Sequence, residues 1–231
     1  SEVLVQQLVH YKPDLQNLEA YVLNNGMALG LVLLGKGKEA DKKLSDMMLA
    51  KKLVAWMQPT PTLGPSNKSG TLVYTTAEVN PYVTAPAAIA ALTLMYLKSN
   101  HQDMAANFLP PNTKYMFEQL RPDVLTLTTL GYHLIMWDHV EATEDWFAAQ
   151  FPSVLANPDG KLLQLDSTLK QAWLAIATGS YLALGYKFAG TFHPACVKLM
   201  VDGIKNLFNL KKTIVSPADK TRLDITLSNS I

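Results

Sequence analysis

Three short segments of this chain share a pattern that strongly constrains its fold. Each begins with Ala-Leu, continues with mostly apolar residues and ends in a turn of Gly, Ser or Asn; they are residues 28–37, 91–100 and 183–190. Small side chains let neighbouring helices approach closely, and a single helix of this kind cannot bury its apolar face alone. The pattern therefore predicts an all-α fold of stacked helical hairpin repeats, with insertions between unevenly spaced copies.

The packing of these repeats should be carried by their small and apolar residues. They are Ala28, Gly30, Gly35, Ala91, Leu92, Ala183, Gly185 and Gly190. A glycine inside a helix costs about 1 kcal/mol relative to alanine. Gly30 and Gly185 therefore indicate a packing reason for their presence. The alternative is that helices rich in small residues are simply common in α-proteins.

Apolar residues at helical spacing predict further structure in the first part of the chain. A helix over residues 15–22 should end at the Asn-Asn-Gly turn of residues 24–26, and a second should occupy residues 26–35. A longer amphipathic helix is expected over residues 39–57. Residues 58–81 are rich in Pro, Gly and Ser, which predicts a surface loop or insertion.

Proline and capping residues mark the helices of the second part. Pro86 suits the first turn of a helix, and Thr143 is followed by two acids that favour a helix start. The alternation of Leu223, Ile225 and Leu227 predicts a short strand near the end. The chain thus divides into a helical repeat domain, 1–210, and a tail that leaves it, 211–231. The other helices expected here are 87–97, 104–109, 114–120, 122–137, 169–188 and 195–208.

Composition argues against two classes of partner. Of 231 residues, 48% are apolar and 17% charged, and the formal net charge is +1. A nearly neutral chain lacks the clustered positive charge that nucleic-acid binding needs, so no nucleic-acid partner is expected. The apolar stretches 27–34, 86–97 and 172–185 fall short of the roughly 20 residues that span a bilayer, so no membrane partner is expected either.

A single cysteine, Cys196, allows no internal disulfide, which predicts a reducing compartment such as the cytosol or nucleus. The first residues contain no basic segment typical of a signal peptide. They also lack an initial methionine, so we expect the chain to be a piece of a longer one.

The best candidates for chemistry are His133, Asp138, His139 and Glu141. A metal site or an acid–base pair could draw on such residues. However, a helix presents metal ligands three or four residues apart, and the residue four after His133 is Trp137, which ligates nothing. We therefore expect no catalytic residue, metal or cofactor. A helical enzyme that uses His133, Asp138 and His139 is kept as an alternative.

The three repeats resemble the proteasome/cyclosome (PC) repeat family, which occurs in the two largest non-ATPase subunits of the proteasome cap and in the largest subunit of the anaphase-promoting complex, or cyclosome. Residues 79–98, which contain Thr84-Ala85-Pro86, look like the cyclosome branch. So do residues 115–138, which contain Arg121-Pro122-Asp123 and end in Leu-Ile-Met-Trp-Asp. The resemblance covers most of residues 20–208.

Two features depart from the family pattern: Ala87 stands where glycine is usual, and residues 141–170 are shorter and less familiar. Within the matching regions, the resemblance implies a curved helical solenoid or closed toroid that serves as a non-catalytic scaffold of a ubiquitin ligase. The implied partners are other subunits of the anaphase-promoting complex, a substrate-recruiting co-activator and a small β-sandwich co-receptor subunit. The implied location is the nucleus and cytoplasm.

The family also undergoes mitotic phosphorylation, for which Thr60 and Ser216, each followed by proline, are the candidate sites. Such dipeptides are frequent by chance. The alternative within the family is a scaffold of the proteasome cap that binds ubiquitin-like domains. Residues 115–138 distinguish the two, because the proteasome proteins should lack this run.

Overall fold

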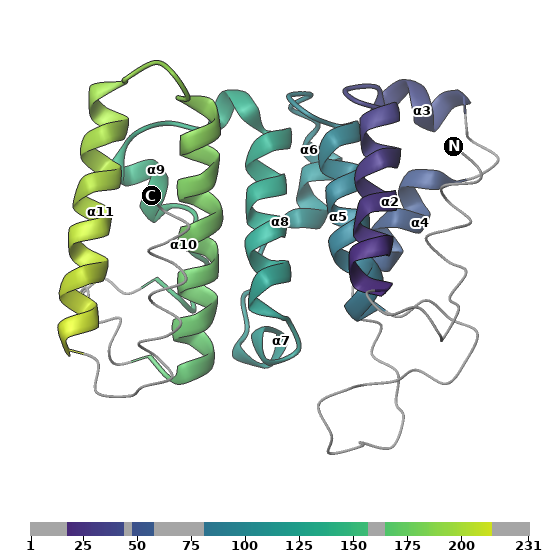
Figure 1. Cartoon of the computed structure of the whole chain (residues 1–231). Helices are drawn as coiled ribbons and strands as arrows, with labels where there is room; N and C mark the ends of the chain where they lie inside the picture. The colour runs from purple at the N-terminus through teal and green to yellow at the C-terminus, as the bar shows by residue number, and fades with distance from the viewer. Residues whose placement is uncertain (1–17, 44–47, 58–80, 157–164, 214–231) are drawn as a thin grey trace, which may run out of the picture. The chain divides into compact units, whose positions relative to one another are not determined.

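A computed structural model describes residues 18–43, 48–57, 81–156 and 165–213 (Figure 1). Within these ranges all regular structure is helical and no strand occurs, which confirms the all-α prediction. The predicted strand at 223–227 lies outside the described residues, as does the predicted loop except for its last residue. None of the described helices is long and apolar enough to cross a membrane.

The chain divides into two compact units, residues 1–101 and 102–231, here called unit 1 and unit 2. In unit 1, the central helix α5 packs against both α2 and α4 (Figure 1). The core includes the fully buried Leu29, Leu53 and Leu92. The described helices of unit 1 are α2 (Leu18–Val32), α3 (Gly37–Lys43), α4 (Leu49–Met57) and α5 (Pro81–Met95).

The predicted break at residues 24–26 is wrong, because α2 runs through these residues as one helix. Gly26 is buried, and a Cβ atom added there would lie 2.7 Å from the Cα atom of Ala87. The glycine therefore serves close packing against α5 within a continuous helix. The predicted helix end near Gly35 is confirmed: Gly35 has a φ of 67°, in the left-handed region that glycine tolerates.

The predicted single helix over residues 39–57 is also wrong. The described structure has α3 ending at Lys43 and α4 beginning at Leu49. Met48, just before α4, has a φ of 47°, which lies outside the right-handed helical region. Met48 is 59% exposed, whereas Leu53 within α4 is fully buried.

Pro86 lies inside α5 and not in its first turn, because α5 begins at Pro81. A proline within a helix removes one backbone hydrogen bond and normally destabilises it. The neighbouring Ala85, Ala87 and Ala88 are buried, so tertiary packing contributes to the stability of this part of α5. A proline at the first helical position favours the earlier start.

Unit 2 is organised around α10, which packs against α8 and α7. Helix α5 of unit 1 ends near its predicted end, and the short helices of unit 2 lie near their predicted bounds. The predicted helix cap at Thr143 is confirmed, because the Thr143 hydroxyl accepts a hydrogen bond of 3.1 Å from the Trp146 N–H. The described helices of unit 2 are α6 (Gln102–Ala105), η2 (Ala106–Phe108), α7 (Lys114–Glu118), α8 (Pro122–Ile135), η3 (Trp137–His139), α9 (Glu144–Ala148), α10 (Ser167–Lys187) and α11 (Pro194–Thr213).

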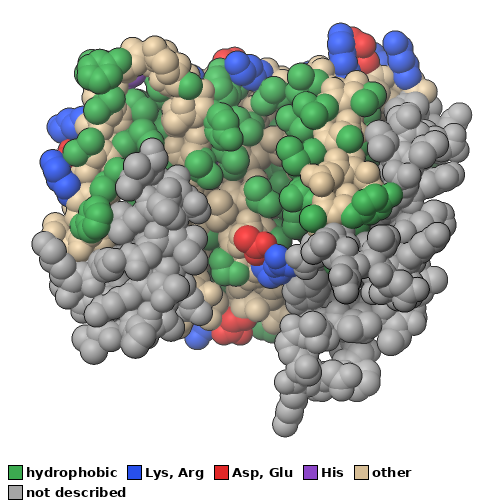
Figure 2. Space-filling view, in the orientation of Figure 1, with side chains coloured by type: hydrophobic (Ala, Val, Ile, Leu, Met, Phe, Trp, Pro, Cys, Tyr) green, Lys and Arg blue, Asp and Glu red, His purple; other side chains and the backbone are tan. Residues whose placement is uncertain are grey.

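Helix α11 buries a different face from the one its apolar stripe indicates. Val197, Val201 and Phe208 are 39%, 42% and 46% exposed, and apolar side chains are visible along α11 in Figure 2. The buried residues of this helix are Cys196, Gly203 and Leu207. This side suits contact with Tyr181, because Gly203 leaves room for the tyrosine ring.

Candidate functional site: the small-residue helix contacts

Two copies of the repeated segment face each other in unit 1. A Cβ atom added at Gly30 would lie 3.0 Å from the Cα atom of Ala91 and 2.8 Å from Cβ of Leu94. One turn earlier, Gly26 lies against Ala87 in the same way. Residues four apart share one helix face. A strip of two glycines on α2 therefore meets a strip of two alanines on α5, and we call this contact the glycine–alanine seam.

The glycine–alanine seam is buried, and a backbone hydrogen bond joins the two segments just beyond its end. Gly26, Gly30, Ala87 and Ala91 are all buried, and the adjacent Leu92 is fully buried. Beyond the end of α2, the N–H of Gly35 donates a hydrogen bond of 3.0 Å to the carbonyl oxygen of Leu94. Backbones that approach this closely gain many van der Waals contacts, which fixes the register of the two helices.

Helix α3 is held against the end of α5 by Tyr96. A Cβ atom at Gly37 would lie 2.7 Å from the tyrosine ring, and the Tyr96 hydroxyl donates a hydrogen bond to the Asp41 carboxylate. Burial and the Asp41 carboxylate together raise the pKa of Tyr96. The ring also meets His101 edge-on at a centroid distance of 5.3 Å. These contacts make α3 a fixed part of unit 1.

A related contact joins α8 and α10 in unit 2. A Cβ atom at Gly179 would lie 2.8 Å from both the carbonyl oxygen of Thr126 and Cβ of Thr129. The Thr126 hydroxyl donates across the pair to the Ala175 carbonyl at 3.2 Å. Here small and hydroxyl-bearing residues replace the alanines, and hydrogen bonding adds to the close packing.

The third repeat copy, in α10, has a different environment. Ala183 is 2% exposed. Gly185 is exposed, and a Cβ atom there would meet no described atom within 4 Å. Gly190 has a φ of 71°, so it serves the turn after α10. Ala28 in α2 is half-buried. A packing role for Gly185 thus has no contact among the described residues to support it and stays a prediction.

Sequence reasoning missed Gly26, Gly179 and Gly203 as packing residues. Gly26 was assigned to a turn because Asn-Asn-Gly is a common turn sequence. The spacing of Gly26 and Gly30, four residues apart within an apolar stretch, was the available signal. Gly179 and Gly203 stand alone in their helices, so only their neighbours in space identify them. The candidate phosphosites Thr60 and Ser216 lie outside the described residues.

The candidate catalytic residues do not converge. His133 is 2% exposed and its Nε2 has no hydrogen-bond partner among described residues, whereas Asp138 and His139 are exposed on η3. Burial lowers the pKa of His133 to about 4, so the imidazole is neutral near pH 7. No group of three or more His, Cys, Asp or Glu residues in the described ranges could hold a metal ion.

Cys196 is a buried free thiol whose pKa is raised by burial, which disfavours the reactive thiolate. Its sulfur lies 3.9 Å from that of Met200. The Cys196 N–H donates to Nδ1 of His193 at 3.3 Å. His193 thereby caps the start of α11.

Residues 1–230 of the 231-residue chain match the family model described as APC1 fifth domain. The chain therefore belongs to the family of the fifth domain of anaphase-promoting complex subunit 1.

Individual relatives agree with this assignment. The chain is 34% identical to anaphase-promoting complex subunit 1 of Arabidopsis thaliana over 187 residues, 75% of this chain and 11% of that protein. It is 30% identical to the subunit of the same name from Schizosaccharomyces pombe over 215 residues, 91% of this chain and 13% of the other. A protein of Emericella nidulans named negative regulator of mitosis is 30% identical over 199 residues, 84% of this chain and 9% of its own length. The chain thus spans about a tenth of these relatives.

Proposed function

We propose that this chain is a non-catalytic scaffold region of an anaphase-promoting complex, the ubiquitin ligase of the mitotic cell cycle. Family membership supports the assignment to subunit 1, and the mitotic name of the Emericella relative agrees with it. These relatives favour the cyclosome branch over the alternative of a proteasome scaffold. The proposed partners are the other subunits of the complex, a substrate-recruiting co-activator and a small β-sandwich co-receptor subunit.

The observation that carries the scaffold proposal is the glycine–alanine seam. One of its two contacts joins two copies of the repeated segment, Gly30 in one and Ala91 in the other, and Gly26 and Ala87 extend the same contact by one turn. A unit that packs copy against copy can be extended by further copies, which is how helical solenoids form. We accordingly propose a curved solenoid or toroid built from such pairs, with residues 1–210 as its helical part. Thr60 and Ser216 remain the proposed phosphosites, and nucleus and cytoplasm the proposed location.

Affinity purification of the tagged full-length parent tests the proposal. Recovery of cullin and RING subunits is expected, and recovery of proteasome ATPases instead would overturn it. A parent that carries Gly30→Leu should recover less of these subunits, because leucine cannot fit against Ala91. The matched control is Gly185→Leu, at a glycine with open space beside it. Equal losses from both variants would contradict the role of the seam.

A further inference from the structure

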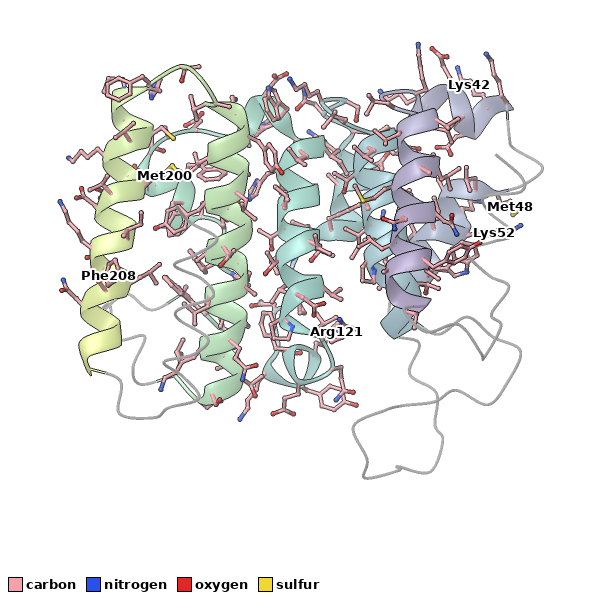
Figure 3. All side chains as sticks on the ribbon, in the orientation of Figure 1. Lys42, Met48, Lys52, Arg121, Met200 and Phe208 are labelled. Atoms are coloured by element: carbon pink, nitrogen blue, oxygen red, sulfur yellow. The ribbon has the colours of Figure 1, made fainter. Side chains whose placement is uncertain are left out.

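We draw no further inference here: the strongest candidate, the apolar stripe that Val197, Val201 and Phe208 form along α11 (Figure 3), is an exposed helix face, and nothing in the part of the chain that the structure describes shows what covers it.

Discussion

Units 1 and 2 both bring helices together at residues with little side chain, but they complete the contact differently. In unit 1, Gly26 and Gly30 meet Ala87 and Ala91, and the contact has no side-chain hydrogen bond of its own. In unit 2, Gly179 meets threonines, and Thr126 adds a hydrogen bond across the helices. The stability of the glycine–alanine seam depends on close packing alone. We therefore expect it to tolerate an added side chain less well than the α8–α10 contact does.

The units also fill their remaining space differently. Unit 2 uses aromatic pairs: Phe151 stacks on Trp173 at a centroid distance of 5.0 Å, and Phe147 stacks on Tyr181 at 4.7 Å. Aromatic pairs add stabilisation beyond their buried area. The buried His133 lies against Trp146, and its Nε2 has no hydrogen-bond partner in the part of the chain that the structure describes. Unit 2 should therefore be sensitive to acid, whereas unit 1 should be sensitive to steric change.

The largest expected effect is that of Gly26→Leu in the seam. Backbone atoms of Ala87 occupy the position of any added side chain, so the substitution should destabilise unit 1 by about 3 kcal/mol or more. Chemical denaturation followed by circular dichroism measures this loss. Gly185→Leu is the control and should be neutral or stabilising by up to about 1 kcal/mol, since it removes an exposed helical glycine. A stable Gly26→Leu protein would show that α2 and α5 do not depend on shape.

Acid should weaken unit 2 through His133. The pKa of His133 is lowered by burial from 6.5 to about 4 in the folded protein. The unfolded chain therefore binds more protons between these values, and stability should fall by about 3 kcal/mol as the pH drops from 6.5 to 4.

Denaturation curves of the wild type and of His133→Phe across this range check the prediction. The variant should lose this part of the pH dependence, because phenylalanine carries no proton. The exposed His139→Phe is the control and should retain it. An identical pH profile for all three proteins would exclude His133 as the cause.

Gly203→Ala should produce a smaller effect in unit 2. An added Cβ would overlap the Tyr181 hydroxyl and lie 2.6 Å from the adjacent ring carbon. The ring is enclosed, so we expect a loss of about 2 kcal/mol, measured by thermal or chemical denaturation. Combining it with Tyr181→Phe should recover part of this loss, because the hydroxyl is removed. If the double variant is no more stable than Gly203→Ala, the overlap is not the source of the loss.

The smallest effect is expected at the caps. Thr143→Ala removes the acceptor for the Trp146 N–H, 3.1 Å away, and should cost about 1 kcal/mol. Thr113→Ala removes a longer hydrogen bond of 3.4 Å to the Met116 N–H and should cost less. Hydrogen exchange of the first turns of α9 and α7 would compare them directly. The reverse order would mean that cap geometry does not govern these short helices.

Sequence alone determined the helical class and most helix positions in the second half, because these depend on local periodicity, caps and turn residues. It identified Gly30 and Ala91 as packing residues, but it assigned Gly26 to a turn. Only the tertiary structure decided that Gly26 faces Ala87, that Gly185 faces open space and that the stripe of Val197 on α11 is exposed. The physical reason is that a glycine or an apolar stripe has the same local preference wherever it stands, whereas its role depends on which atoms another helix brings within contact distance.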